Sequence, residues 1–218
     1  MRQIAPNLTL SAAAGIAPWV DSNGSPLTDL SAYDSVLDWV GKSLSHPFFP
    51  CTHSPPEIMN YDVFGTFSQV TGPNSPLNDA CAATSGQQGS ATSAVAAWTK
   101  AGFSANKLVL GVASYGHSFT VSPSVAVTGG KLNIYTSFDK TNIPIGDSWD
   151  PPSTTPDICG NPPVGNGNSG IYHYWALVQG GFLNQDGSFA SGMTGLYDNC
   201  SQTVRPCHRE AFKCLNHC

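Results

Sequence analysis

Residues 58–67 read Ile-Met-Asn-Tyr-Asp-Val-Phe-Gly-Thr-Phe, and this stretch decides how we interpret the fold. It opens with a short apolar run, Ile58-Met59, and then places a phenol and a carboxylate side by side at Tyr61 and Asp62. A short buried strand that ends in polar groups is typical of a parallel α/β barrel, because catalytic side chains of that fold lie at the C-terminal ends of its strands. By itself, a Tyr-Asp pair is also what the end of an ordinary surface strand contains.

A second motif follows downstream and strengthens this interpretation. Residues 114–119 read Ser-Tyr-Gly-His-Ser-Phe and come directly after the apolar run at 108–112, which predicts a buried strand. Between the two motifs, residues 91–100 consist of good helix formers and end before Gly102, so we expect a helix there. Polar groups thus follow two predicted strands that are joined by a predicted helix.

The two motifs together resemble family 18 of the glycoside hydrolases, the fungal chitinases in particular. The resemblance rests on Met-x-Tyr-Asp at 59–62 and on Tyr-Gly-His-x-Phe at 115–119, and it runs from about residue 1 to about 203 with one break. It implies an α/β fold, namely the part of a (β/α)8 TIM barrel that contains about strands five to seven, with a small α+β insertion domain. The expected domains are 1–118 for the partial barrel, 119–203 for the insertion domain and 204–218 for a tail outside the family pattern.

The length and one segment of the chain support the expectation of a partial barrel. A complete barrel needs roughly 250 residues, whereas this chain has 218. Residues 41–57 contain four prolines and no hydrophobic period, and they fall where a strand should begin. We interpret 41–57 as an insert derived from a translated intron, because its ends can be encoded by splice-site sequences. A genuine surface loop is the alternative.

Other expected elements come from the spacing of apolar residues. Residues 8–14 are small and weakly alternating, which predicts a buried strand, and the loop after it contains Trp19. Residues 29–40 have apolar positions at helical spacing and predict a helix. Beyond residue 119, glycines, prolines and aromatic residues dominate, with strand-like pieces such as 131–138 and a helical turn or two within 169–178.

Composition excludes several classes of function. The net charge is −5 and charged residues make up 11% of the chain, so the basic stripe that nucleic-acid binding requires is missing. No run of about 18 apolar residues exists, so we expect no membrane span. The residues after Met1 contain no apolar signal-peptide core, and an extracellular location is expected from the family resemblance.

The seven cysteines leave the disulfide framework partly open. Cys159 and Cys200 lie in the part that resembles the family, and we expect them to pair; a buried free thiol is the alternative. The pairing of Cys51, Cys81, Cys207, Cys214 and Cys218 cannot be predicted. The Cys and His residues of 204–218 match no zinc module, so we expect no metal site and interpret the tail as read-through sequence.

What the resemblance implies about chemistry is substrate-assisted hydrolysis of chitin, in which the acetamido oxygen of the sugar attacks its own anomeric carbon. Tyr61 would align the acetamido group, Asp62 would contact the sugar, and Met59 would pack under the acetamido pocket. The other residues expected to bind substrate are Trp19, Phe67, Tyr115 and His117. We expect no cofactor, chitin or chitooligosaccharides as the partner, and a monomer in the complete protein.

The general acid of the family is the residue that this sequence lacks. The family places it in a D-x-x-D-x-D-x-E motif, and the two glutamates of this chain, Glu57 and Glu210, lie in no such context. General acid catalysis contributes about 10²–10⁴-fold, so we predict that the chain alone does not hydrolyse chitin. Whether it belongs to an active enzyme stays open, with two alternatives: a chitin-binding lectin-like protein, or a small secreted disulfide-rich interaction protein with Cys207 paired to Cys218.

Overall fold

The computed structural model describes residues 9–40, 58–156, 160, 162–163, 166–208 and 213–216, with only the backbone at 39–40, 208 and 213–216. The chain forms two compact units, Met1–Tyr61 with Gly89–Val112 and Asp62–Gln88 with Ala113–Cys218. The expected insert at 41–57 lies outside the described residues.

The first unit is built from parallel strands. Strand β1 (Ser11–Ala12) pairs in parallel with β2 (Trp39–Val40), and β3 (Ile58–Met59) pairs in parallel with β4 (Leu110–Gly111). A parallel bridge between Ala14 and Ile58 connects the two pairs. Helix α2 (Ala91–Lys100) lies between β3 and β4 in the chain, so the order is strand, helix, parallel strand. This is the pattern of an α/β fold.

Helix α2 has the bounds that the sequence predicts. Its N-cap is Ser90, whose hydroxyl accepts a hydrogen bond from the Ser93 backbone N–H at 3.3 Å while the Ser93 hydroxyl accepts one from the Ser90 N–H at 2.8 Å. Trp98 is fully buried and packs in a core with Leu30 and Ile58. A well-capped helix with one apolar face is therefore the part of the first unit that sequence predicts best.

The helix predicted over 29–40 is limited to its first part. Only α1 (Ser31–Asp34) is helical, and β2 follows it. The Lys107 ammonium donates to the backbone carbonyls of Asp34 at 2.5 Å and Leu37 at 3.1 Å. These carbonyls are therefore bound by a side chain where a longer helix would use its own N–H groups. The predicted strands at 8–14 and 108–112 exist as the shorter β1 and β4.

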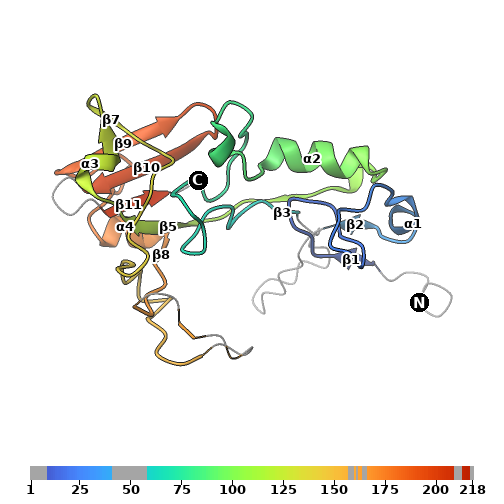
Figure 1. Ribbon diagram of the computed structural model, residues 1–218, viewed down its shortest axis with the longest axis horizontal. Helices are drawn as coiled ribbons and strands as arrows, with labels where there is room; N and C mark the ends of the chain where they lie inside the picture. Colours follow the sequence, from blue (N-terminus) through green and yellow to red (C-terminus); the bar gives the residue numbers. More distant parts are fainter. Residues whose placement is uncertain are drawn as a thin grey trace. The chain divides into compact units, whose positions relative to one another are not determined.

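The second unit contains a five-stranded antiparallel sheet in the order β8-β5-β11-β10-β9 (Figure 1). The strands are β5 (Tyr115–Thr120), β8 (Ile171–His173), β9 (Met193–Asp198), β10 (Thr203–His208) and β11 (Lys213–Asn216). The residues that we expected to form a tail outside the family pattern, 204–218, thus supply β11 and most of β10. Because β11 lies between β5 and β10, these residues complete the sheet.

Buried side chains attach β10 to the rest of the second unit. Arg205 is 3% exposed, and its guanidinium donates to the backbone carbonyls of Asn133 and Ile134. Burial lowers the pKa of Arg205 to about 10. Cys207 packs in a core with Phe119 and Val121.

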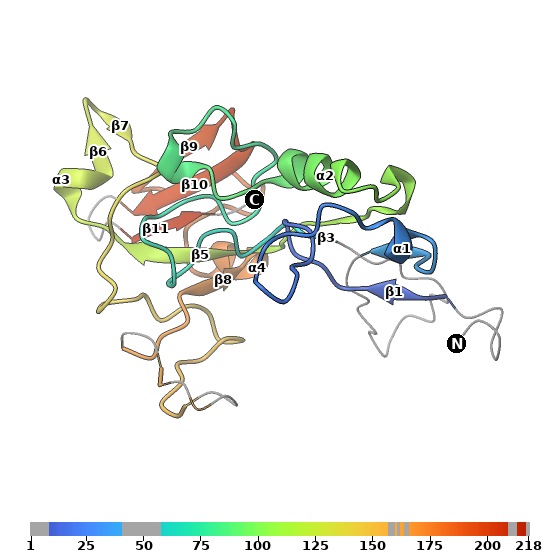
Figure 2. The same cartoon turned by 45° about the vertical axis from the view of Figure 1, so that its right-hand side comes forward.

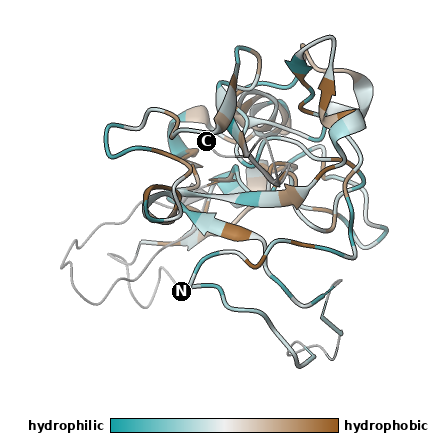
Figure 3. Ribbon diagram, turned by 90° about the vertical axis from the view of Figure 1, so that its left-hand side faces the viewer, coloured by the Kyte–Doolittle hydropathy of each residue, from teal (hydrophilic) through white to brown (hydrophobic). Residues whose placement is uncertain are grey.

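The strands contain both apolar and polar residues. In the ribbon coloured by hydropathy, these residues are interspersed along the strands, as expected for a sheet with one covered face (Figure 3).

Short elements surround the sheet. They are η1 (Thr84–Gly86), α3 (Pro123–Ala126), β6 (Val127–Thr128), β7 (Lys131–Leu132) and α4 (Tyr174–Gln179), while η2 (Ala105–Lys107) belongs to the first unit. Helix α4 begins at the end of β8 (Figure 2). The helical turns predicted within 169–178 are therefore α4, preceded by a strand, whereas the strand predicted at 131–138 is limited to β7.

The predicted disulfide is wrong. Cys200 bonds to Cys81, with 5.9 Å between their Cα atoms, and Cys159 lies outside the described residues. The Leu77 N–H donates to the Ser201 carbonyl at 2.8 Å, which brings the 78–82 loop to the turn between β9 and β10. This contact joins segments more than a hundred residues apart, so the local context of each cysteine did not reveal it. Cys207 is also disulfide-bonded.

Candidate functional site

Asp62 begins the second unit in an uncommon backbone conformation. Its φ is +57°, in the left-handed region, which a residue other than glycine occupies at a cost unless its surroundings hold it there. The buried Asn74 provides that support, because its side-chain oxygen accepts the Asp62 N–H at 3.0 Å and its backbone carbonyl accepts the Val63 N–H at 3.2 Å. The Asn74 amide also donates to the Tyr115 carbonyl at 2.8 Å, which ties this loop to β5.

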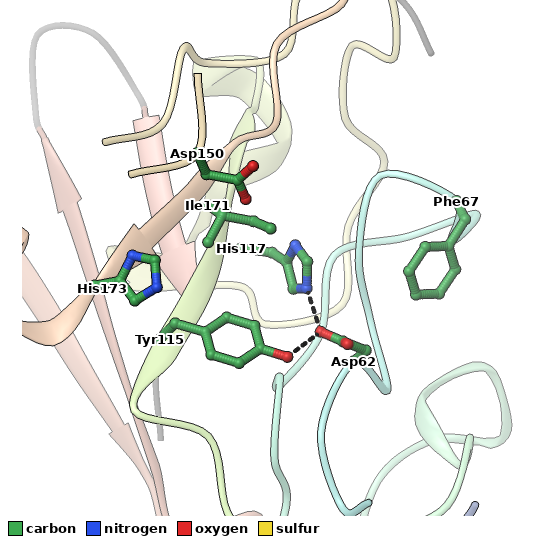
Figure 4. A pocket seen from close by; sticks show the side chains of 7 residues that line it. All are labelled: Asp62, Phe67, Tyr115, His117, Asp150, Ile171 and His173. Atoms are coloured by element: carbon green, nitrogen blue, oxygen red, sulfur yellow. Dashed lines mark hydrogen bonds and ion pairs between the residues drawn. The ribbon is translucent and has the colours of Figure 1, made fainter. Parts of the chain in front are cut away.

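One oxygen of the Asp62 carboxylate receives two hydrogen bonds from β5. The Tyr115 hydroxyl donates to Oδ1 at 2.6 Å, and His117 Nε2 lies 2.9 Å from the same oxygen (Figure 4). Tyr115 and His117 are two residues apart on a strand, so their side chains project from the same face. The side chain of Asp62 is 47% exposed, whereas that of His117 is 8% exposed. The carboxylate is therefore oriented by the protein and still open to a ligand.

A second histidine–aspartate pair lies on the same unit. His173, the last residue of β8, places Nδ1 2.8 Å from Asp147 Oδ2, and its backbone N–H donates to the same oxygen at 2.5 Å. The Trp149 N–H donates to the other oxygen of Asp147 at 2.9 Å. Burial acts to raise the pKa of Asp147, but the backbone N–H groups of His173 and Trp149, together with the His173 imidazole, hold the pKa of this carboxyl below its ordinary value. Asp147 is therefore ionised at neutral pH.

The two pairs flank one cavity of about 270 Å³. The Tyr115 ring lies between the imidazoles, 6.0 Å from that of His117 and 6.2 Å from that of His173. The cavity is lined by Asp62, Phe67, Tyr115, His117, Asp150, Ile171 and His173 (Figure 4). Aromatic rings beside oriented hydrogen-bonding groups suit a ligand that combines apolar ring faces with hydroxyl or amide groups, as a sugar does.

A second cavity of about 300 Å³ adjoins the same loop. The exposed ring of Phe67 lines both cavities. Val63, Phe64 and Val70 supply apolar lining to the second cavity, and its polar lining residues are uncharged. Phe67 therefore lines two cavities of different chemistry: the first contains carboxylate and imidazole groups, and the second contains amide and hydroxyl groups.

Of the residues predicted for substrate binding and catalysis, the second unit contains Asp62, Phe67, Tyr115 and His117, and all four line the first cavity. The others, Trp19, Met59 and Tyr61, belong to the first unit. Met59 is part of β3. The ring of Trp19 packs 5.0 Å from that of Trp98 and 5.1 Å from that of Tyr33, which is a core contact.

Sequence reasoning missed Asp147, His173 and Asp150. Asp147 and His173 are 26 positions apart in the chain, and neither residue belongs to a motif that we recognised. The one signal was the density of aromatic residues around them, Trp149 and Trp175 included. Within the described ranges, no group of three or more His, Cys, Asp or Glu residues could hold a metal ion, and no helix is long and apolar enough to cross a membrane.

Comparisons with known proteins connect this geometry to a family. The model of Glycosyl hydrolases family 18 matches residues 57–202. A chitinase-like effector of Moniliophthora perniciosa is 44% identical over 199 residues, which is 90% of this chain and 40% of that protein. A chitinase-like effector of Moniliophthora roreri is 43% identical over 202 residues, which is 91% of this chain and 44% of that protein. The chain thus spans less than half the length of these curated relatives.

Among solved structures, a chitinase from Rhizomucor miehei is similar to this chain with a TM-score of 0.77 and 28% sequence identity. The similarity covers 99% of this chain and 52% of that structure. It extends beyond the range of the family model and includes the residues after 202, where the motif resemblance ends. The last strands of the sheet therefore belong to a part of the chain that has a structural counterpart.

Proposed function

The chain belongs to family 18 of the glycosyl hydrolases, and from this premise we propose that it binds oligomers of N-acetylglucosamine and does not hydrolyse them. The observation that carries the proposal is the Asp62 carboxylate, which is held by Tyr115 and His117 and exposed to a cavity that Phe67 also lines. Such a carboxylate accepts hydrogen bonds from the hydroxyl and amide groups of a sugar, and the Phe67 ring can stack on its apolar face.

The expectation that the chain alone does not hydrolyse its ligand rests on its glutamates. Glu57 and Glu210 are the two glutamates in the chain, and neither lies in the motif that supplies the acid in the family. Without a proton donor at the leaving oxygen, the acetamido attack that Tyr61 and Asp62 would support has no acid to complete it. The description of the two curated relatives as chitinase-like effectors supports a role other than catalysis.

Calorimetry with chitotetraose tests the proposal, together with release of a chromophore from a chromogenic chitobioside. We expect measurable heat of binding and no chromophore release. Asp62→Asn is the appropriate variant, because asparagine also tolerates the left-handed conformation and the change removes mainly the charge. Hydrogen bonds to charged groups contribute about 1.5–3 kcal/mol, so we expect Asp62→Asn to weaken binding roughly tenfold or more.

Tyr115→Phe tests the orientation of the Asp62 carboxylate without removing its charge. This change removes the hydroxyl that donates to Asp62 Oδ1 and keeps the ring, so we expect a smaller loss of affinity, roughly threefold to tenfold. Absence of binding by the unaltered chain would overturn the proposal. Release of the chromophore by the pure chain would refute the statement that it does not hydrolyse its ligand.

A second candidate is that the same residues act in hydrolysis within a longer protein. The Met59-x-Tyr61-Asp62 spacing and the coverage of 40% and 44% of the curated relatives favour it. We then expect the parallel strands of the first unit to be part of a (β/α)8 barrel. A transcript with an in-frame D-x-x-D-x-D-x-E segment before Met1 and without codons 41–57 would support this candidate. A mature message that begins at Met1 and retains these codons would exclude it.

One disulfide supports a location for the protein. The Cys81–Cys200 disulfide favours an oxidising compartment, and together with the family it supports secretion. We expect the protein to act outside the cell, with chitin or its soluble oligomers as the partner, and the complete protein to be a monomer. Size-exclusion chromatography with light scattering of the protein recovered from culture medium tests both expectations.

A further inference from the structure

The turn between β9 and β10 contains an acceptor sequence for N-linked glycosylation. Residues 199–201 read Asn-Cys-Ser, which is the Asn-x-Ser pattern that receives glycans in secreted proteins. The same kind of pattern occurs at 23–25, Asn-Gly-Ser, and at 7–9, Asn-Leu-Thr, where Asn7 lies outside the described residues. Because so short a pattern also arises by chance, the surroundings of each asparagine decide whether its side chain is available as an acceptor.

The Asn199 side chain is available to a modifying enzyme. Asn199 is exposed and directly follows Asp198, the last residue of β9. Its backbone carbonyl accepts a hydrogen bond from Gln202 Nε2 at 2.7 Å, whereas its side-chain amide has no hydrogen-bond partner among the described residues. The nitrogen that would form the bond to a sugar, Nδ2, is therefore free of competing contacts.

Asn23 is also exposed, but its tripeptide is held in a closed turn. The Asp21 carboxylate accepts the N–H groups of Asn23 at 2.8 Å and Ser25 at 3.0 Å, and the Asp21 N–H donates to the Ser25 carbonyl at 2.8 Å. Pro26 follows directly and restricts the backbone of Ser25, the hydroxyl residue of this tripeptide. These constraints favour Asn199 over Asn23 as the acceptor.

The surroundings of Ser201 indicate when the modification takes place. Its Oγ lies 2.5 Å from Asp198 Oδ2 and 2.7 Å from Thr203 Oγ1, and Ser201 is buried. The middle residue of the tripeptide, Cys200, is bonded to Cys81. The acceptor pattern requires the hydroxyl as well as the amide, and in the folded turn this hydroxyl is inaccessible. A glycan must therefore be attached while the turn is still open.

We propose that Asn199 carries an N-linked glycan, attached in the secretory pathway before Cys200 pairs with Cys81. In this reaction, Asn199 Nδ2 loses a proton and forms a bond to the anomeric carbon of an oligosaccharide. The bond from that carbon to the diphosphate of a lipid donor breaks, and the lipid diphosphate leaves. The inference rests on the part of the proposed function that places the protein outside the cell, and it is independent of sugar binding at Asp62.

A glycan at this position shields the open edge of the sheet. Among the described strands, β9 pairs with β10 alone, and an unpaired strand edge is a template for pairing with another chain. Two exposed apolar residues border the turn: Tyr197 near the end of β9, and Leu77, whose N–H donates to the Ser201 carbonyl at 2.8 Å. Strands β5 and β8, which carry residues of the candidate site, form the other side of the sheet and stay open to a ligand.

Enzymatic deglycosylation in water enriched in oxygen-18 tests the site. The full chain is secreted from a eukaryotic host with a secretory leader, and peptide-N-glycosidase then converts each glycosylated asparagine to a labelled aspartate. Peptide mapping reports Asn199 and Asn23 separately, and we expect the label at Asn199 in most chains and little at Asn23. Asn199→Gln should lower the mass of the secreted protein by one glycan, whereas the matched control Asn23→Gln should not. A secreted chain with no label at Asn199 would overturn the proposal.

Cys81→Ser tests the order of events, because it removes the disulfide and leaves the tripeptide unaltered. Glycan occupancy at Asn199 should be at least as high as in the unaltered chain. A lower occupancy would show that the modification depends on the closed turn, and the proposed order would be wrong.

Light scattering at increasing protein concentration tests the shielding of the edge. Removal of the glycan from the folded protein should increase self-association and leave the affinity for chitotetraose unchanged. Equal scattering before and after removal would overturn the shielding.

The outcomes separate the glycan from the proposed function. A secreted chain that binds chitotetraose and has no label at Asn199 overturns the glycan, and the proposed function stands. A chain with the label that binds no oligomer supports the glycan and refutes the proposed sugar binding. If the protein made by its own cells is retained inside them, the proposed location fails and the glycan fails with it.

Discussion

Asn74 is the residue on which the geometry of the candidate site depends most. It is fully buried, accepts the N–H of Asp62 and donates to the carbonyl of Tyr115. Asn74→Ala would leave both backbone groups without that partner, and an unsatisfied buried polar group costs about 1–3 kcal/mol. We expect the free energy of unfolding to fall by about that amount, and the affinity for chitotetraose to fall because Asp62 is no longer held in its left-handed conformation.

Urea denaturation and calorimetry measure these two effects. Asn199→Ala serves as the control, since Asn199 is an exposed asparagine of the same unit and should change neither quantity appreciably. If Asn74→Ala retained both the stability and the affinity of the unaltered chain, Asn74 could not be the residue that positions Asp62.

Sequence reasoning at this scale identified the residues that belong to motifs. Asp62 and Tyr115 were selected from two short motifs, and the structure joins them by a hydrogen bond. The Asp147–His173 pair and Asn74 were not selected, because nothing local distinguishes an ionised aspartate or a buried asparagine from the many others in loops. Such residues become recognisable only when the chain brings together positions that are 26 or 41 residues apart.

Among the elements, helix α2 was predicted with its correct bounds and the last two strands were not recognised. The helix has a cap, an apolar face and a glycine just beyond its end, all within thirteen residues. Strand β10 pairs with its chain neighbours β9 and β11, but β11 also pairs with β5, which is far away in sequence. The Cys and His content of 204–218 suggested unrelated sequence instead. Tertiary pairing decided their conformation, which local propensity did not indicate.

Strand β11 provides the prediction at this scale. Its backbone pairs with β5 from Lys213 opposite Thr120 to Asn216 opposite His117, and it also pairs with β10. Proline cannot donate a hydrogen bond to a ladder, and inside a central strand it removes a ladder hydrogen bond that the native residue can make. We therefore expect Leu215→Pro to lower the melting temperature by several degrees, since 1 kcal/mol corresponds to roughly 2–4 °C for a chain of about this size.

The same change should weaken oligomer binding, because β5 carries both Tyr115 and His117. Leu215→Val is the matched control, since valine favours strands and keeps its N–H. Differential scanning calorimetry and binding calorimetry of the two variants make the comparison. Equal melting temperatures for Leu215→Pro and the unaltered chain would mean that β11 is dispensable, as an unrelated tail would be.

At the scale of the whole molecule, the chain spans 40% and 44% of its curated relatives, and we ask which interactions stabilise its second unit. The second unit is assembled from two separate segments, Asp62–Gln88 and Ala113–Cys218, and the intervening residues belong to the first unit. The Cys81–Cys200 disulfide joins these two segments covalently across a sequence separation of 119. In the chain-entropy account, a bond that closes so long a loop stabilises mainly by restricting the unfolded chain.

We therefore expect the Cys81→Ser/Cys200→Ser double variant to lose about 2–4 kcal/mol of unfolding free energy, measured by urea denaturation. The two single variants should each lose about as much as the double variant, because either change breaks the same bond and the effects of one interaction are not additive. Substitution is preferable to a reducing agent, since Cys207 is also disulfide-bonded and would be reduced as well. If the single-variant losses added up in the double variant, each cysteine would stabilise the fold through separate contacts, and the bond would not be what joins the two segments that carry Asp62 and Tyr115.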